Sequence, residues 1–396
     1  MVAVLAPIEG LRRLEPSVIA ANLNAGQGFT FEQYGAVYHA LKEPLYIVLL
    51  AWLTRWVGES NLAVLVFQSF FGVCTAVGVA LIARHLLGDP ARATLAGMIA
   101  AVNPFLIYYD THFIYPLSMD AFLFVATVGA ALVAGSDGAR GLGRTLLAGL
   151  VMGLALWQRA TLLAAGAAVW AGAVLLGGPH RRKQLARATV WFCVAMLAVS
   201  PWLFRNYLLF GRVVLTTDFA HVLWLGNNPW SNGTYSDMEG RRVFHLADPA
   251  FRERFHGTSE IGQYDLFLGE VRRFALENPG KFGDLVLRRL WAFVWFSPNA
   301  GIEYAAWQRA LYRAAYTGLL SLGVLGFALY WRRANNEEHR RVVMLISSVF
   351  GLAAVHALTA INLKHRVPLE LVLAVFAAES ISRGFALVRA REGRMV

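Results

Sequence analysis

The sequence predicts an all-α polytopic membrane protein, and three observations support this fold class. Of the 396 residues, 57 % are hydrophobic and only 15 % are charged, whereas a soluble domain carries about 25 % charge. The apolar residues form separate runs close to the roughly 20 residues that a helix needs to cross a bilayer. Basic residues are concentrated in every second connection between these runs. The composition therefore excludes a soluble globular protein.

Nine apolar runs are long enough to be read as transmembrane helices. A polar stretch at 205–310 interrupts them, and it is rich in Trp, Tyr, Asn, Gly and charged residues. Such a composition is suited to holding a polar ligand beside the bilayer. The nine expected spans are 62–83, 92–109, 117–134, 143–158, 160–178, 188–204, 311–331, 342–361 and 368–388.

The distribution of Lys and Arg predicts the orientation. Alternate connections and the C-terminal tail hold sixteen basic residues, whereas the intervening short loops hold only Arg159, Lys364 and Arg366. Because cytoplasmic loops carry an excess of Lys and Arg, the first set is expected inside and 205–310 outside, in a periplasm or its equivalent. The same bias accounts for the net charge of +11 without a nucleic-acid partner. The sixteen are Arg84, Arg92, Arg140, Arg144, Arg181, Arg182, Lys183, Arg187, Arg332, Arg333, Arg340, Arg341, Arg383, Arg389, Arg391 and Arg394.

This orientation places residues 1–61 on the outer side, because the first span then runs inward. The opening run Met1–Ile8 is too short to cross a membrane. The run 44–57 has the length of an interfacial or re-entrant helix, and Trp52 and Trp56 suit a membrane interface. We therefore expect a first transmembrane helix upstream of Met1. The alternative makes 44–57 a short span and starts the chain inside.

Two amphipathic helices are expected within the polar stretch. Hydrophobic residues recur at helical spacing over 262–277, and Asn278-Pro279-Gly280 ends that pattern. The run 282–296 carries Arg288-Arg289, which would be costly to expose to lipid, so it should lie on the outer surface. The resulting regions are a first outer loop with interfacial helices at 1–61, core transmembrane helices at 62–204, the large outer loop at 205–310, and C-terminal transmembrane helices with a basic tail at 311–396.

Ionisable and polar side chains gather at the outer ends of the expected spans. Burying such groups is costly, so they are candidates for a functional site. A carboxylate can take the proton of a hydroxyl, and cations can stabilise charge on a leaving phosphate. No carboxylate pair has obvious metal-ligand spacing, so no metal site or cofactor is predicted, and dependence on a divalent ion stays open. The set comprises Glu15, Lys42, Glu43, Asp110, His112, Asp120, Gln158, Arg159, Lys364, His365, Arg366 and Glu370.

Several of these residues also have a structural interpretation. Arg159 and Arg366 could contact lipid phosphates at the interface. Asp110 could cap the helix that follows it. His112 and His365 are of a type that more often serves as a hydrogen-bonded structural residue than as a catalytic one.

Five short motifs then carry a resemblance to a known family. By these motifs, in this order, the chain resembles integral-membrane glycosyltransferases of the GT-C type. The closest group is the protein-O-mannosyltransferase-like family 39, with the bacterial aminoarabinose transferase and the RgtA/B/C/D-like transferases of lipopolysaccharide cores. The resemblance covers nearly the whole chain and implies a GT-C-like bundle with outer juxtamembrane helices. The motifs are Ile19–Leu23 with Gly26–Phe29, Lys42-Glu43-Pro44-Leu45-Tyr46, Asn103-Pro104-Phe105 with Tyr108-Tyr109, Trp224–Pro229 with Gly233, and Lys364-His365-Arg366-Val367-Pro368.

The resemblance implies a hexosyl- or pentosyltransferase of a bacterial inner membrane. Its donor would be a polyprenyl-phosphate sugar, and its acceptor a hydroxyl of a glycan, lipid or protein at the outer face, as in lipopolysaccharide or cell-wall glycan synthesis. Two alternatives stay open. One is a lipid-glycan ligase or polymerase that uses a diphosphate donor. The other is a polytopic lipid or sugar transporter, which should show repeat symmetry and polar groups at the bilayer midplane.

The resemblance also implies roles for individual residues. Glu15 is the expected catalytic base, at a place where relatives usually carry Asp. Lys42 and Glu43 are expected beside the donor. The remaining expectations are Arg159 and Arg366 on the donor phosphate, Asp110 orienting the acceptor or the arginines, Asn227 and Asn228 in a cover on the acceptor side, and His112 and Lys364 as further substrate-binding residues.

Overall fold

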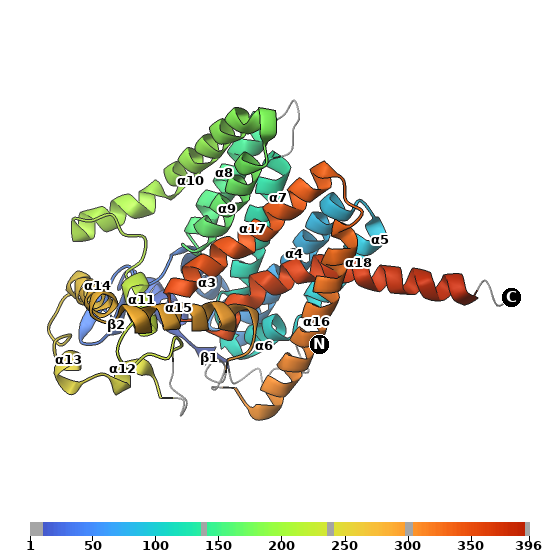
Figure 1. Cartoon of the computed structure of the whole chain (residues 1–396). Coiled ribbons are helices and arrows are strands. Elements are labelled where there is room, and N and C mark those ends of the chain that lie inside the picture. The colour runs from blue at the N-terminus through green and yellow to red at the C-terminus, as the bar shows by residue number, and fades with distance from the viewer. Residues whose placement is uncertain (1–10, 136–140, 236–240, 298–303, 393–396) are drawn as a thin grey trace.

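The computed structural model describes residues 11–135, 141–235, 241–297 and 304–392, with side chains described as far as residue 387. Long helices form a tilted bundle, and shorter helices and loops cover one end of it (Figure 1). The predicted short opening run Met1–Ile8 lies outside the described residues, as do Arg140 and Arg394. The side chains of Arg389 and Arg391 are not described either.

All nine apolar runs coincide with helices, so the expected all-α membrane fold is confirmed. The second run is divided into two helices bent by 43° relative to each other. Pro104 begins the second of these, and the Asn103 side chain accepts hydrogen bonds from the first free backbone N–H groups. The helices are α4 (Asn61–Leu87), α5 (Pro90–Ala101), α6 (Pro104–His112), α7 (Leu117–Gly135), α8 (Gly141–Leu156), α9 (Leu162–Leu175), α10 (Arg181–Phe210), α16 (Ala306–Trp331), α17 (Asn336–Leu358) and α18 (Val367–Glu392).

Not all of these helices have full membrane length. Among the described residues, five are long and apolar enough to cross a membrane, namely α4, α7, α10 with the short turn before it, α16 and α17, and the bent α5–α6 pair makes a sixth. Helices α8 and α9 are apolar but shorter. α10 continues to Phe210, past the predicted end at 204, so the polar stretch starts later than expected.

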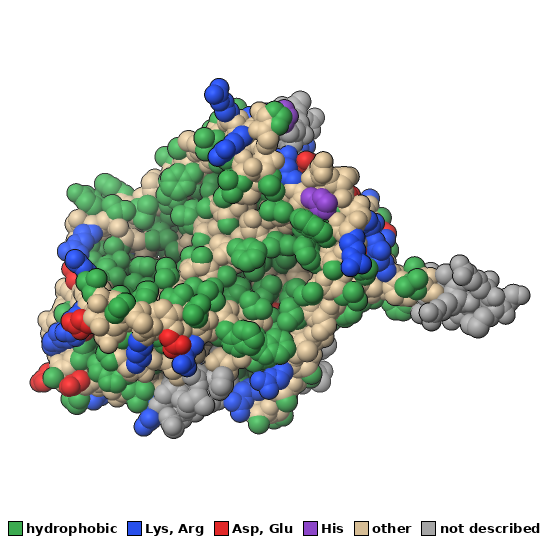
Figure 2. Space-filling model, viewed as in Figure 1, with side chains coloured by type: hydrophobic (Ala, Val, Ile, Leu, Met, Phe, Trp, Pro, Cys, Tyr) green, Lys and Arg blue, Asp and Glu red, His purple; other side chains and the backbone are tan. Residues whose placement is uncertain are grey.

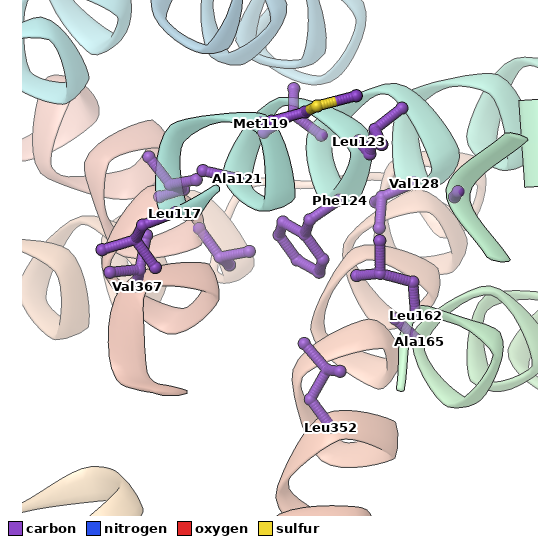
Figure 3. Packing of buried hydrophobic residues seen from close by; sticks show 14 of the residues in the cluster. Leu117, Met119, Ala121, Leu123, Phe124, Val128, Leu162, Ala165, Leu352 and Val367 are labelled. Atoms are coloured by element: carbon purple, nitrogen blue, oxygen red, sulfur yellow. The ribbon is translucent and has the colours of Figure 1, made fainter. Parts of the chain in front are cut away.

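The core of the bundle is formed where α7, α9, α17 and α18 meet. Figure 3 shows Phe124 and Val128 of α7 facing the side of Leu162 on α9, with Leu352 of α17 below them. α18 contributes a run of buried residues from Leu371 to Ala378. Since successive residues of this run are buried all round the helix, this part of α18 lies inside the bundle, whereas its C-terminal part extends away from it (Figure 1).

Helices α16 and α18 pack so closely that they require glycine. A Cβ added at Gly326 would lie 1.8 Å from the Phe376 carbonyl oxygen, and one at Gly323 would lie 2.7 Å from the Leu373 side chain. Small residues that let two backbones approach are typical of helix interfaces in membranes. The contact therefore fixes the position of α18.

Replacing Gly326 by alanine is expected to destabilise the protein by about 2 kcal/mol, the usual cost of overpacking. The added methyl would meet backbone, which cannot move aside as a flexible side chain can. Thermal unfolding in detergent measures the loss. Gly318→Ala on the same helix is the matched control, because its Cβ would meet nothing within 4 Å. Equal melting temperatures for the two variants would contradict the packing.

One end of the bundle gathers basic connections that the sequence placed on the cytoplasmic side. The buried carboxylate of Glu379 pairs with Arg92 at 2.7 Å, Arg333 at 3.0 Å and Arg383 at 2.6 Å. These partners come from α5, from the connection after α16, and from α18. Because one carboxylate joins all three, these segments meet at the same end of the bundle.

The opposite end is covered by two layers of short elements. Its helices are α2 (Glu15–Asn24), α3 (Leu45–Val57), α11 (Asp218–Gly226), α12 (Val243–Leu246), α13 (Pro249–Glu253), α14 (Glu260–Glu277) and α15 (Pro279–Val294), with a 3₁₀ turn, η2 (Leu363–Arg366). α14 and α15 lie where the two amphipathic helices were predicted. The sequence did not predict two small sheets, β1 (Arg12–Arg13) with β4 (Phe113–Ile114) and β2 (Phe31–Gln33) with β3 (Ala36–Tyr38).

The polar stretch has an aromatic core of its own. Trp224 stacks on Phe251 with ring centroids 5.1 Å apart, and Phe255 and Phe267 pack beside them. The first outer segment is attached to this unit through the buried Glu260 carboxylate. That carboxylate accepts hydrogen bonds from the backbone N–H groups of His39 and Ala40 at 2.6 and 3.0 Å. The two outer segments therefore form one cover over the end of the bundle.

Helix α3 has the one-sided burial expected of the run 44–57. Tyr46, Ile47 and Leu50 are buried, whereas Trp52 and Trp56 are 62 % and 74 % exposed. Helix α3 packs against α2 and α4. Its interfacial position remains a prediction.

Candidate functional site

A small cavity lies where the segment before α4 meets the ends of the bundle helices opposite the Glu379 cluster. Its volume is about 30 Å³. Three chain segments supply its polar lining: the start of α3, the connection before α7, and the connection between α8 and α9. The lining residues are Pro16, Lys42, Glu43, Tyr46, Ile47, Tyr115, Pro116, Gln158 and Arg159.

Lys42 is held by an acidic partner from the large outer loop. Its Nζ lies 2.5 Å from a carboxylate oxygen of Asp218, in the first turn of α11. Burial disfavours the charge, but Asp218, with smaller contributions from Glu15 and Tyr115, outweighs it and raises the pKa of Lys42 above its ordinary value. Burial disfavours the Asp218 charge too, yet Lys42 holds the pKa of that carboxyl below its ordinary range. The pair is therefore an ion pair at neutral pH.

Arg159 is oriented by Asp120, which lies at the start of α7. One Asp120 oxygen accepts from the Arg159 Nε–H at 3.0 Å and also from its Nη2, and the other accepts from Gln158 Nε2 at 2.7 Å. On the same side, a Glu43 oxygen accepts from the Ala160 backbone N–H at 3.0 Å. Burial raises the pKa of Glu43, although Arg159 acts in the opposite direction. The two carboxylates thus fix the connection that presents Arg159.

Lys364 approaches from η2, far along the chain. Its Nζ donates to the Tyr115 hydroxyl at 2.7 Å and lies 4.6 Å from the centre of that ring. The Tyr235 ring is 5.9 Å from the same nitrogen. Burial disfavours the charge, but the phenol oxygens of Tyr115 and Tyr235 favour it, so the pKa of Lys364 lies above its ordinary value.

Tyr115 marks the point where three cations converge. Lys364, Arg159 and Lys42 all act electrostatically on its phenol. Burial raises the pKa of Tyr115, but these cations together lower it more, and it lies below the ordinary value of about 10. Lys42, Arg159 and Lys364 thus bring positive charge from three chain segments to the cavity, with Asp218 and Asp120 pairing the first two.

Glu15, Asp110 and His112 are not among the residues that line the cavity, but Glu15 is next to one of them. Glu15 is the first residue of α2, next to the lining residue Pro16, and its charge acts on Lys42. Asp110 is buried in α6, where it accepts a hydrogen bond from Ser118 Oγ at 2.6 Å. The His112 ring stacks on Tyr108 with centroids 4.4 Å apart. Neither of these two lines the cavity.

Asn227 and Asn228 lie inside the outer loop rather than at the cavity. Asn227 donates to the carbonyl oxygens of Leu223 and Leu358 and accepts from the buried Arg289 at 2.9 Å. Asn228 donates to a backbone carbonyl and accepts from a backbone N–H within its own turn. The Asn227 amide therefore attaches the loop to α17 and the Asn228 amide closes its own turn, neither residue lines the cavity, and their expected role in substrate binding stays a prediction.

Arg366 does not line the cavity, is 1 % exposed and is bound to backbone, while its buried Nη1 has no hydrogen-bond partner among the described residues, so its expected contact with the donor phosphate stays a prediction. Its guanidinium donates to the carbonyl oxygens of Ala292 at 2.8 Å and Phe293 at 3.2 Å, and also to that of Trp295. These carbonyls end α15, and cations at a helix C-terminus satisfy such orphan acceptors. The ring of Tyr316 lies 4.4 Å from the guanidinium carbon. Arg366 therefore anchors α15, and Lys364 is the residue of this motif that reaches the cavity cluster.

Three residues near the cavity, Asp218, Tyr235 and Tyr115, were not predicted from the sequence. Asp218 and Tyr235 lie in the polar stretch, where aromatic and acidic residues are common and no spacing distinguishes them. Tyr115 lies just before an expected span, where an aromatic residue is usually an interface anchor, so its position gives no signal for a site. Among the described residues, no three His, Cys, Asp or Glu side chains gather so that they could hold a metal ion.

Comparison with known proteins supports the fold and the family type. Residues 42–204 match a family model described as dolichyl-phosphate-mannose-protein mannosyltransferase. No curated protein sequence matches the chain. The matched region begins at Lys42 and includes Tyr115 and Arg159, so it contains much of the cavity lining.

Two solved structures share the fold. One is the archaeal oligosaccharyltransferase AglB from Archaeoglobus fulgidus in complex with an inhibitory peptide and a dolichol-phosphate, with 17 % identity, a TM-score of 0.54 and coverage of 96 % of this chain and 47 % of that one. The other is the apo form of the Archaeoglobus fulgidus oligosaccharyltransferase, with 16 % identity, a TM-score of 0.57 and coverage of 99 % and 49 %. The chain thus spans about half the length of these structures.

A third structure, ArnT from Cupriavidus metallidurans bound to undecaprenyl phosphate, is 15 % identical with a TM-score of 0.45, over 96 % of this chain and 74 % of that one. The family model and the archaeal structures confirm the resemblance to GT-C-type glycosyltransferases that the motifs indicated.

Proposed function

We propose that this protein transfers a sugar from a polyprenyl-phosphate donor to a hydroxyl group at the outer face of a bacterial inner membrane. The observation that carries the proposal is the convergence of Lys42, Arg159 and Lys364 around a cavity at the outer end of an apolar bundle. A lipid-linked phosphate could lie there with its chain in the bilayer and its sugar under the outer loop. The dolichol-phosphate in the AglB structure and the mannosyltransferase family model agree with a donor of this class.

The proposed reaction forms one glycosidic bond and breaks another. The acceptor oxygen attacks the anomeric carbon of the sugar, and the bond from that carbon to the phosphate oxygen breaks. The polyprenyl phosphate leaves with the electron pair, and the three cations stabilise the added negative charge. Glu15, beside Lys42, takes the proton of the acceptor hydroxyl. Glu43 positions the connection that carries Arg159 and does not itself react.

The orientation follows from the charge bias of the connections. The Glu379 cluster joins basic connections at the end of the bundle away from the cavity, and cytoplasmic loops are the basic ones. The cavity then faces the periplasm, where no nucleotide sugar is supplied. A lipid-linked donor made on the other side of the membrane suits this position.

Transfer with defined substrates tests the proposal. The purified protein is reconstituted in liposomes and incubated with a radiolabelled polyprenyl-monophosphate hexose or pentose, with and without a glycolipid, oligosaccharide or peptide acceptor. We expect label to move from the monophosphate donor to one acceptor class. Transfer of a whole glycan from a polyprenyl-diphosphate donor alone would instead indicate a ligase or polymerase. Movement of an intact lipid-linked sugar across the liposome membrane without transfer would indicate a transporter.

Donor binding should weaken at alkaline pH as Tyr115 loses its proton. The phenolate would neutralise part of the positive charge that the donor phosphate requires, so affinity is retained below the pKa of Tyr115 and lost as pH rises through it. The ordinary pKa of tyrosine is about 10. Because the pKa of Tyr115 is lowered from that value, the loss of donor binding should begin below pH ~10. Titrations of polyprenyl-monophosphate binding against pH measure this.

Tyr115→Phe should move the loss of binding to higher pH. Tyr235→Phe is the control, because burial raises the pKa of Tyr235 and its proton should stay in place over the same range. A pH profile unchanged by Tyr115→Phe would contradict the role of this phenol.

A further inference from the structure

A second concave surface lies at the other end of the bundle, between α9 and α10. Its volume is about 350 Å³, and it is lined only by Ala, Val, Leu and Trp side chains. Helix α9 begins beside the Arg159 connection and runs away from it, so the groove near its far end is separate from the cation site. The lining residues are Ala167, Trp170, Ala171, Val174, Leu175, Leu185, Ala188 and Trp191.

The groove is a depression because small exposed residues lie above large buried ones. Ala167 and Ala171 are exposed, whereas Trp170 and Trp191 beneath them are each 2 % exposed, with ring centroids 6.2 Å apart. Larger side chains at the alanines would fill the depression. Leu175 and Leu185 stand 70 % and 57 % exposed at its inner end. On a helix pair that faces lipid, such a depression loses contacts unless a hydrocarbon chain occupies it.

Basic residues lie at the end of the groove nearest the start of α10. Arg181 is the first residue of α10 and lies one turn before Leu185, on the same face of the helix. Arg181, Arg182 and Lys183 are all exposed. Figure 2 shows Lys and Arg side chains at the top of the molecule, where α10 begins in Figure 1, above a largely apolar surface. Basic residues beside the cytoplasmic membrane surface attract anionic lipids.

We propose that this groove binds one anionic glycerophospholipid of the leaflet opposite the cation site. An acyl chain would lie over Ala167 and Ala171, and the phosphate headgroup would lie beside Arg181 and Arg182. The apolar lining with basic residues at one mouth matches the chemistry of such a lipid along its length. The site is independent of the proposed transferase activity, because it shares no residue with the cation cavity.

Native mass spectrometry of the detergent-purified full chain tests the proposal. The protein is titrated with phosphatidylglycerol or phosphatidylcholine carrying the same acyl chains. We expect one phosphatidylglycerol to be retained in preference. Arg181→Gln should weaken its binding about fivefold, the effect of one basic residue beside an anionic headgroup. Ala171→Phe should abolish retention of the lipid by filling the groove.

Matched variants separate this site from general effects. Arg332→Gln removes an exposed arginine from another connection at the same end of the bundle, and Ala315→Phe enlarges an exposed alanine on α16. Both should retain the lipid as the wild type does. Equal retention of the two lipids, retention unaffected by Ala171→Phe, or preferential binding of a polyprenyl phosphate would overturn the proposal, as would a dimer that buries the groove. Because Arg181 is on the surface, Arg181→Gln keeps the test valid if Ala171→Phe fails to fold.

Discussion

Replacement of Lys42 by methionine is expected to reduce sugar transfer by about 100- to 1000-fold, the cost of removing one preorganised charge-stabilising donor. Methionine keeps the length and apolar stem of lysine but removes its charge. Lys42 is paired with Asp218 at 2.5 Å and lies in the cavity, so its loss also leaves a buried carboxylate without its cation. That carboxylate would repel the donor phosphate. Initial rates with the labelled polyprenyl-monophosphate sugar measure the effect.

Two further variants distinguish chemistry from folding. Lys281→Met removes another lysine of the outer segments, one that is exposed and donates only to the Pro229 carbonyl oxygen among the described contacts. It should retain near-wild-type transfer. The double change Lys42→Met with Asp218→Asn removes both charges of the pair, so it should recover folding stability but not transfer. Wild-type rates in Lys42→Met membranes would remove Lys42 from the donor site.

The helices were predictable because each signal is local in the sequence. A run of apolar residues at membrane length is sufficient to place α4 or α17, and Pro279 marks the boundary between α14 and α15 because its missing N–H suits the first position of a helix. The bend between α5 and α6 has the same origin at Asn103-Pro104. The pairing of β1 with β4 was missed because it depends on a distant partner: Arg12 pairs with Phe113 across most of the first segment and three helices.

The site was less predictable because burial and partner choice are properties of the folded chain. The sequence shows that Arg159, Lys364 and Arg366 are basic and near the outer face, and it treats them alike. In the structure, Nε and Nη2 of Arg366 donate to the carbonyl oxygens that end α15, whereas Lys364, two residues away, reaches Tyr115. Both residues lie in the 3₁₀ turn η2, and their side chains leave this turn in different directions. Similarly, only the fold shows that Asp218, about 180 residues after Lys42, is its partner.

Replacement of Glu15 by glutamine is expected to lower the rate of transfer by about 100- to 10,000-fold, the usual range for loss of a general base. Glutamine has nearly the shape of glutamate but cannot accept the acceptor's proton. Donor binding should change little, because the phosphate is held by Lys42, Arg159 and Lys364 and not by Glu15. A binding titration and a rate measurement on the same preparation therefore give different answers for this variant, whereas Lys42→Met should impair both.

Glu15→Asp and Glu32→Gln complete this test. Aspartate retains the carboxylate on a shorter side chain, so it should recover part of the rate if Glu15 acts as a base. Glu32 is an exposed glutamate of the same outer segment, on β2, and its replacement should leave transfer unchanged. If Glu15→Gln transfers sugar at the wild-type rate while Glu43→Gln does not, the proton goes to Glu43 instead. Such a result would make the buried carboxylate beside Arg159 the reacting group, and Glu15 a residue that only balances the charge of Lys42.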